Sequence, residues 1–404
     1  MSPPPTPIDI PPTAFAALAL LRQSFENILP PETDFGVGVK QVAGQFQEQL
    51  ALVVFVPKKL PPNALPPEQV IPTVWTDPGT GTQFVTDVVQ SNPVRIALIN
   101  DSSFHAALVG GIEIGWEEQL GGPLVTVHRG TLGCTVQRRS DGGRQLLTAN
   151  HVAPLNVEVS QPAPGGPQSS AIGTVTKADL QLDCSAVELN STRGAPLTMI
   201  QDLGPVFGSA PAQLFGVAKK RGRTTGVTTG VVVAIVVDAS MVVKEIRLDT
   251  FPFGGLYCWF GDSGSAVLNG NNEVIGLLLA MDQTTVDDNG NPTASVGLAA
   301  PIQAVIDALD VEVAVSPPMI TAVQPNTAAG VLANGGITQL DGLGFDAGST
   351  VTFGGTAVLS VVPASPLRLI VTPPPFFPGS TVDVIVTNGL GQQSSPSPTA
   401  RFTY

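Results

Sequence analysis

The chain has 404 residues, including 43 glycines and 38 prolines, and only 13% of its residues are charged. This length predicts two or three domains, and the many turn formers favour short strands over long helices, so we expect a mainly β protein. The formal net charge of -13 argues against nucleic acid as a partner, because phosphate binding needs clustered Lys and Arg. The apolar runs are all well short of the roughly 18 residues of a membrane span.

The N-terminus lacks the marks of a secretory signal. Residues 1–5 carry no basic segment, and the apolar stretch 14–21 fits an amphipathic helix better than a signal core. The three cysteines, Cys134, Cys184 and Cys258, are an odd number that forms no disulfide framework by itself. We therefore expect a cytoplasmic protein with reduced thiols, with export by a signal-independent route as the alternative.

Residues 1–107 are expected to form a small α/β lead-in region. A Pro-rich tail precedes a predicted helix over residues 13–29, which ends before Pro30. Short β-branched or aromatic runs follow at 36–39 and 52–56, and these predict strands. The position of this region before the rest of the chain suggests a docking or regulatory role.

Residues 108–315 form the predicted central domain. Short strand-like runs alternate there with Gly, Asn and Asp turns, which is typical of a barrel or a sandwich. A helix is expected to close this domain, because Pro301 begins a segment with apolar residues at helical spacing up to Leu309.

Residues 316–404 form the third predicted domain. The segment 316–318 is a Pro-containing linker, and the residues after it contain no Cys, His or Lys. Alternating strands, such as 350–353 and 382–386, predict a small β-sandwich. The segment resembles the TIG (IPT) family of immunoglobulin-like domains. The resemblance is carried by four motifs: Ile320-Thr321-Ala322-Val323-Gln324-Pro325, Gly342-Leu343-Gly344-Phe345, Thr352-Phe353-Gly354-Gly355 and Phe402-Thr403-Tyr404.

Ser263 is the candidate nucleophile of the central domain. It lies in the run Gly261-Asp262-Ser263-Gly264-Ser265-Ala266, whose glycines permit a tight turn. Acyl transfer by serine needs donors for an oxyanion, and the amides of Gly261 and Ser263 would supply them. By itself the run is also compatible with an ordinary hairpin turn.

The candidate base and its orienting acid lie upstream of the serine. His151 ends an apolar strand, whereas His105 and His128 are better explained as structural residues. An orienting acid belongs on or beside an apolar strand, which favours Asp183 over the alternative, Asp179.

The order of these residues resembles that of the chymotrypsin-like serine peptidases of bacterial type. Leu147-Thr148-Ala149-Asn150-His151, Asp183 with the apolar residues after it, and Gly261-Asp262-Ser263-Gly264 are similar to the three motifs of that family. The resemblance implies two six-stranded barrels with the triad between them. His151 would act as base and then acid, Asp183 would hold its tautomer, and Ser263 would form the acyl-enzyme.

Four further features are interpreted as structural. Asp262 is expected to make a structural ion pair or a turn hydrogen bond, and 222–231 a β-hairpin with solvated basic residues. Cys258 is expected to be a buried thiol. The segment 287–291 lacks the terminal Glu of a calcium loop and is interpreted as a turn, so we expect no metal or cofactor.

The substrate pocket is predicted from the segments that flank the nucleophile. Tyr257 stands six residues before Ser263, where trypsin-type members carry Asp, and Ile275, Gly276 and Leu277 follow the nucleophile. These residues predict a preference for apolar or small side chains over Lys or Arg.

The leading hypothesis is a serine endopeptidase that cleaves a protein or peptide substrate, with the TIG-like domain binding a protein partner or positioning substrate. Two alternatives remain. One is a catalytically inactive, peptidase-fold binding protein. The other is an exported surface or adhesion protein, which the C-terminal sandwich supports.

Overall fold

The computed structural model describes residues 10–404 except 31–32, 43–44, 57, 91–100, 122–123, 191, 241, 251–255, 287–291 and 376. The chain divides into two compact units. The first comprises Met1–Gly204, Ser209–Gly270 and Val274–Val313, and the second comprises Pro205–Gly208, Asn271–Glu273 and Ala314–Tyr404. The predicted boundary between residues 107 and 108 does not coincide with a boundary between these two units. The prediction of a mainly β protein is confirmed.

A closed barrel of six strands lies in the first unit, as far as the structure describes it. Its strands follow the order β14-β17-β18-β19-β16-β15, and pairing of β14 with β15 closes the ring. The bounds are β14 (Val217–Gly222), β15 (Gly226–Val237), β16 (Val243–Asp249), β17 (Ala266–Leu268), β18 (Val274–Val286) and β19 (Pro292–Pro301). The run 231–237 is rich in β-branched residues, which favour strands, and it lies in the buried half of β15. β14 and β15 form the hairpin expected at 222–231.

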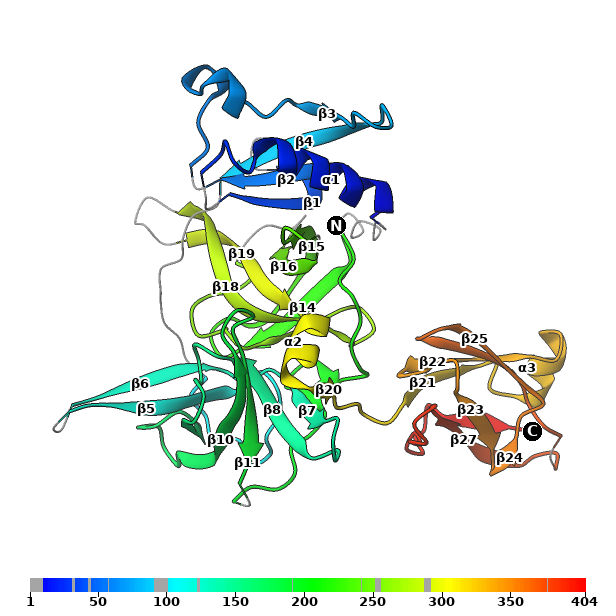
Figure 1. Cartoon of the computed structure of the whole chain (residues 1–404). Helices are drawn as coiled ribbons and strands as arrows, with labels where there is room; N and C mark the ends of the chain where they lie inside the picture. Colours follow the sequence, from blue (N-terminus) through cyan, green and yellow to red (C-terminus); the bar gives the residue numbers. More distant parts are fainter. Residues whose placement is uncertain are drawn as a thin grey trace. The chain divides into compact units, whose positions relative to one another are not determined.

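The N-terminal region extends this barrel and is not a separate layer. β1 (Asp34–Val42) pairs with β15, and β2 (Gln45–Val56), β4 (Gln83–Gln90) and β3 (Val74–Thr76) continue the sheet in that order (Figure 1). α1 (Pro12–Phe25) buries Ala14, Ala17, Leu18 and Leu21 in one hydrophobic cluster with Phe35 of β1. The lead-in region thus shares its core with the barrel, because an apolar sheet edge and an apolar helix face must both be covered.

A second sheet of eight strands carries the other half of the first unit. Its order is β20-β7-β8-β11-β10-β9-β5-β6, so the described strands differ from the expected six-stranded barrel. The bounds are β5 (Glu113–Gly121), β6 (Leu124–Thr131), β7 (Thr135–Arg138), β8 (Arg144–Ala149), β9 (Glu158–Gln161), β10 (Ser170–Asp179), β11 (Cys184–Leu189) and β20 (Val311–Val313). Between β19 and β20 runs α2 (Ile302–Leu309), which begins after Pro301 as predicted and buries its apolar face.

The second unit contains a sandwich of two four-stranded sheets (Figure 1). One sheet has the order β21-β22-β26-β25 and the other β24-β23-β27-β28. The bounds are β21 (Met319–Gln324), β22 (Thr338–Leu343), β23 (Thr350–Phe353), β24 (Thr356–Ala357), β25 (Ser360–Ser365), β26 (Arg368–Thr372), β27 (Thr381–Thr387) and β28 (Arg401–Thr403), with α3 (Ala328–Ala333) after β21. Inward-facing residues such as Leu340, Phe353 and Val384 fill the space between the sheets.

Among the described helices, none is both long and apolar enough to cross a membrane.

Candidate active site

His151 and Asp183 are brought together by two paired strands. His151 lies two residues beyond the end of β8, and Asp183 immediately precedes β11. The two strands are antiparallel with Cys184 opposite Ala149, so the segments that leave them run side by side. Asp183 Oδ2 lies 2.5 Å from His151 Nδ1, and Asp183 Oδ1 accepts the His151 amide at 2.8 Å. The carboxylate therefore fixes both the ring and the backbone of His151.

The backbone of Asp183 is itself constrained. Its φ is 50°, in the left-handed region that Asp and Asn tolerate better than most residues. Its carbonyl accepts the Asn150 amide at 3.0 Å, which ties the turn to the histidine segment. Asp179 instead accepts the amides of Gln181 and Leu182 at 2.9 and 2.8 Å. Asp179 thus caps a local turn, and Asp183 is the acid beside the imidazole.

The solvent exposure of this pair leaves the ring accessible. The side chains of His151 and Asp183 are 48% and 27% exposed. With Nδ1 protonated and donating to the carboxylate, the neutral ring presents the lone pair of Nε2. A ring in that tautomer can accept a proton at Nε2.

The Ser263 loop precedes β17 of the barrel and packs against the end of β6 in the eight-stranded sheet. Gly261 and Gly264 have φ values of 94° and 90°, which favour glycine. A Cβ atom on Gly264 would lie 2.3 Å from the carbonyl oxygen of Thr131. Thr131 also donates its amide to the Ser263 carbonyl at 2.9 Å and its hydroxyl to the Gly261 carbonyl at 2.7 Å. The glycines therefore let the loop approach the end of β6 closely.

The amides of Gly261 and Ser263 donate to no acceptor within the described part of the chain. Their neighbours do donate, since the Asp262 amide bonds the Trp259 carbonyl at 3.0 Å and the Gly264 amide bonds Leu278 at 2.7 Å. The two remaining N–H groups are consequently free for a ligand oxygen.

Asp262 anchors the loop through a fully buried ion pair. Its Oδ2 lies 2.8 Å from Lys220 Nζ, and both side chains are 0% exposed. The carboxylate also accepts the Thr224 and Thr225 amides at 2.8 and 3.1 Å and the Trp259 amide at 2.9 Å. This agrees with the structural ion pair expected for Asp262, and the full set of partners offsets the cost of burying its charge.

Ser263 and His151 line one cleft of about 400 Å³. The Ser263 hydroxyl donates to the Leu279 carbonyl at 2.8 Å, so this hydrogen bond must break before the hydroxyl can donate to Nε2 of His151. The cleft is largely apolar apart from His151, Asp183 and Arg129. Its lining residues are Arg129, His151, Asp183, Cys258, Trp259, Phe260, Gly261, Ser263, Leu278, Leu279, Ala280 and Met281.

The four residues predicted to line the substrate pocket are absent from this lining. Tyr257 is 0% exposed and packs in the barrel core, where Gly297 leaves room for its ring. Ile275, Gly276 and Leu277 lie within the paired part of β18. The cleft uses the next four residues of that strand, 278–281, because the ladder places these beside Ser263.

Arg223, the basic residue of the segment 222–231 that was expected to be solvated, is buried, and so is the neighbouring Arg221. Arg223 is 8% exposed, and its guanidinium lies 2.6 Å from Glu113, whose side chain is 0% exposed. Arg221 is 7% exposed and lies 2.5 Å from Asp101. Burial by itself would raise the pKa of Asp101, but the hydrogen bond and charge of Arg221 outweigh it, and the pKa lies below its ordinary value. Arg223, next to the barrel strand β14, is thereby paired with Glu113 of β5 in the second sheet, which local charge patterning did not reveal.

The three thiols are free and buried. Burial raises the pKa of Cys258 to about 12, so this residue of the cleft lining is a protonated thiol at neutral pH. Among the residues that the structure describes, no group of three or more His, Cys, Asp or Glu side chains is placed to hold a metal ion.

The other two histidines do not line the cleft of Ser263 and His151. His128 stacks on Trp116 with ring centroids 4.5 Å apart and contacts Glu118 at 2.8 Å. His105 Nε2 lies 3.7 Å from Asp101. Neither lines the cleft, which agrees with their interpretation as structural residues.

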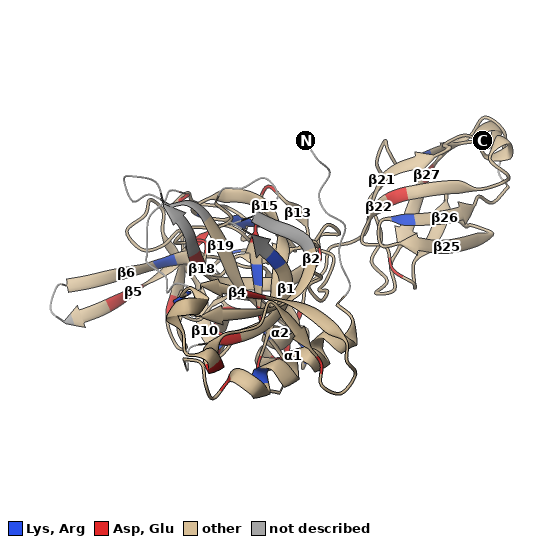
Figure 2. Ribbon diagram, turned by 90° about the horizontal axis from the view of Figure 1, so that it is seen from above, with Lys and Arg blue, Asp and Glu red and all other residues tan. Residues whose placement is uncertain are grey.

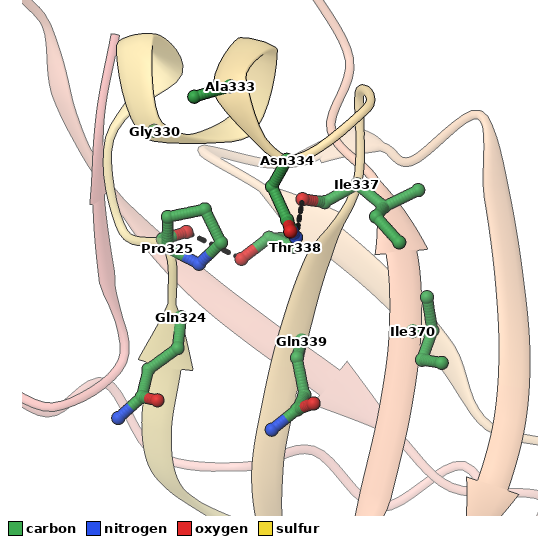
Figure 3. Close-up of a pocket in the computed structure, with 9 residues that line it drawn as sticks. All are labelled: Gln324, Pro325, Gly330, Ala333, Asn334, Ile337, Thr338, Gln339 and Ile370. Atoms are coloured by element: carbon green, nitrogen blue, oxygen red, sulfur yellow. Dashed lines mark hydrogen bonds between the residues drawn. The ribbon is translucent and has the colours of Figure 1, made fainter.

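The sandwich carries a hollow of its own, of about 480 Å³, below α3 (Figure 3). Thr338 donates to the Pro325 carbonyl at 2.5 Å, and Asn334 donates to the Ile337 carbonyl at 3.2 Å (Figure 3). The amide of Gln339 is engaged by Asp341 at 3.0 Å. Because these polar groups bond one another, the hollow presents few free donors to a ligand.

Residues 318–404 match the model of the IPT/TIG domain, and the sandwich is such a domain. Three solved structures resemble about half of the chain. Thermobifida fusca protease A is 20% identical over 52% of this chain and 100% of its own, with a TM-score of 0.38. Nocardiopsis protease is 17% identical over 51% and 98%, with a TM-score of 0.37. A glutamic acid-specific serine protease is 22% identical over 51% and 100%, with a TM-score of 0.38.

No curated protein matches the sequence. The three structural likenesses are too low in identity and TM-score to bear on activity, so the case for a reaction depends on the geometry of the site.

Proposed function

We propose that this protein is a serine endopeptidase in which Ser263 forms the acyl-enzyme. The observation that carries the proposal is the double attachment of His151 to Asp183, at 2.5 Å to the ring and 2.8 Å to the amide. This attachment presents the Nε2 lone pair to the cleft that Ser263 lines. Orientation of a base by a carboxylate is what an activated serine requires.

The proposed reaction assigns a role to each group. His151 Nε2 takes the proton of the Ser263 hydroxyl as that oxygen attacks the scissile carbonyl, and then gives the proton to the leaving amine. Asp183 stabilises the imidazolium formed in between. The amides of Gly261 and Ser263, which have no other acceptor among the described residues, receive the oxyanion. A water molecule then hydrolyses the acyl-enzyme by the same proton route.

The proposed specificity is for an apolar or small side chain. Its support is the lining of the cleft, where Trp259, Phe260 and the strand residues 278–281 are apolar. A cleavage profile over a peptide library would be dominated by such side chains next to the scissile bond. A profile dominated by Lys or Arg would contradict this.

Labelling with a fluorophosphonate probe tests the proposed nucleophile. The wild-type protein is expected to be labelled at Ser263, and Ser263→Ala to be unlabelled. Ser265→Ala is the matched control, because its hydroxyl donates to the Asp262 carbonyl 2.5 Å away in a buried position and does not line the cleft. Equal labelling of wild type and Ser263→Ala, or none of the wild type, would refute the proposal.

One observation favours a non-catalytic binding protein as the second candidate. The Ser263 hydroxyl is engaged by the Leu279 carbonyl and not by His151. If this rotamer persisted with substrate, the hydroxyl would stay protonated and the protein would bind peptides without cleaving them. Mass spectrometry of peptides after incubation separates the two functions, since only a peptidase produces fragments.

The sandwich and the location are part of the proposal. We assign the TIG domain to binding a protein partner or positioning substrate, and the whole protein to the cytoplasm. The three free, buried thiols support a reducing location. Fractionation of the native host tests this, and recovery outside the cell would favour the exported alternative.

A further inference from the structure

A second cavity of about 400 Å³ lies in the N-terminal part of the first unit. It opens between strands β1, β2 and β4 and the segment 58–73, which contains the short helices η1 (Pro62–Ala64) and η2 (Pro67–Gln69). It shares no lining residue with the active-site cleft. Its function is therefore a separate question from that of Ser263.

The walls of this cavity are mainly aliphatic. Val56 and Val88 contribute from the sheet, and the facing segment contributes Leu60, Leu65 and Ile71. A lining of this kind gains from covering an apolar chain, because each buried methylene is removed from water. The volume lies near the lower end of the range for ligand pockets, about 300–1,000 Å³, which suits one unbranched chain better than a two-chain lipid.

Three of the seven lysines in the sequence line this cavity, namely Lys40, Lys58 and Lys59. Lys40 donates to the Thr86 carbonyl at 2.6 Å and lies 3.8 Å from Asp87, the one acidic residue of the lining. Lys58 and Lys59 are exposed, and within the described ranges their ammonium groups form no ion pair. The lining thus carries a net charge of about +2, and the ammonium groups of Lys58 and Lys59 have no ion-pair partner among the described residues.

This positive charge is concentrated against the trend of the chain. The whole sequence has a formal net charge of -13, and Lys and Arg are sparse along the described ribbon (Figure 2). Placing two adjacent, unpaired lysines beside an apolar cavity does not stabilise the fold, since exposed ammonium groups are equally well solvated elsewhere on the surface. They are suited to an anionic group that enters with an apolar body.

We propose that this cavity binds an alkyl carboxylate of medium chain length. The alkyl chain lies against the aliphatic walls, and the carboxylate meets the ammonium groups of Lys58 and Lys59. Both charge and shape enter this assignment: a neutral chain leaves the lysines unused, and a cationic chain is repelled by them.

Titration calorimetry of the full-length protein with three ten-carbon ligands tests the proposal. The ligands are decanoate, decanol and decyltrimethylammonium, which differ in headgroup charge. Decanoate is expected to bind best. Lys58→Gln/Lys59→Gln should weaken decanoate binding about tenfold while leaving decanol unchanged, because the variant removes two exposed ion pairs and no apolar wall.

A control variant with the same loss of charge isolates the local effect. Lys177→Gln/Arg401→Gln removes two exposed cations that do not line the cavity, and it should bind decanoate as the wild type does. Equal affinity for all three ligands, an equal effect of the control, or no binding of decanoate would each overturn the proposal. Labelling of Ser263 is measured on the same samples, so failure here is distinguishable from failure of the proposed peptidase.

Discussion

The two halves of the candidate active site are built by opposite means. The nucleophile loop is anchored by Lys220 and Asp262, which are both 0% exposed, whereas His151 and Asp183 are 48% and 27% exposed. A buried charge pair holds a loop in one conformation because each partner depends on the other. An exposed pair remains accessible to solvent and to a ligand in the cleft. The difference teaches that burial anchors the loop of the proposed nucleophile, whereas the proposed base is accessible.

The largest expected effect falls on the exposed half. Asp183→Asn keeps the size of the side chain but no longer favours protonation of Nδ1, so kcat should fall by about 10⁴-fold. Because Asp183 is partly exposed, the free energy of unfolding should change little. Peptide hydrolysis and urea unfolding measure the two quantities. A variant that loses stability and activity together would show that Asp183 is mainly structural.

The buried half should respond in stability first. Lys220→Met leaves the Asp262 carboxylate without its cation at a fully buried position, which should lower the free energy of unfolding by about 3–5 kcal/mol. Lys219→Met is the matched control, since this neighbour points to the other face of β14 and makes no ion pair with Asp262. Urea unfolding of both variants checks the difference. A loss below about 1 kcal/mol would contradict the anchoring role.

The buried thiols predict a pH dependence on the alkaline side. Burial raises the pKa of Cys134, Cys184 and Cys258 to about 12 from 9.0. Between these values the unfolded chain has lost thiol protons that the native state keeps. The free energy of unfolding therefore falls as pH rises above about 9, by about 1.4 kcal/mol per pH unit for each thiol, and is unaffected by them below that.

Cys134→Ala tests this slope, because it removes one titrating group from the first unit. The dependence of the unfolding free energy on pH between 9 and 11 should become shallower by about 1.4 kcal/mol per pH unit, which is the contribution of one thiol. An unchanged slope would mean that this thiol is not buried in the native state.

The smallest effect is expected for an exposed ion pair in the sandwich. Arg401 lies 3.2 Å from Asp383, and their side chains are 58% and 42% exposed. Arg401→Gln should change the free energy of unfolding by less than about 1 kcal/mol, because solvent screens the pair. A change as large as that of Lys220→Met would break the contrast between buried and exposed pairs.

The sequence was sufficient to predict features that depend on one short segment of the chain. The glycine-flanked serine, the histidine at the end of an apolar strand and the helix after Pro301 are local features, and the structure has each of them in place. The C-terminal sandwich was also readable, since its strands alternate with period 2 and its motifs match the IPT/TIG domain.

Tertiary structure decided what depends on residues far apart in the chain. The partners of Lys220, Arg221 and Arg223 are distant in sequence, so the local sequence did not show that Arg223, which was expected to be solvated, is buried. The side chain of Tyr257 lies in the barrel core and not in the cleft, because Gly297 has no side chain and leaves room for the ring there.

The register of β18 and the pairing of β1 with β15 were also decided by the tertiary structure. The pairing of β18 places residues 278–281, and not the predicted 275–277, beside Ser263. The apolar edge of the barrel could be covered by any suitable strand, and only the fold shows that the N-terminal strands cover it. The sequence by itself predicted the candidate reactive groups and their order. The folded chain determined their surroundings, because long-range pairing has no local signature.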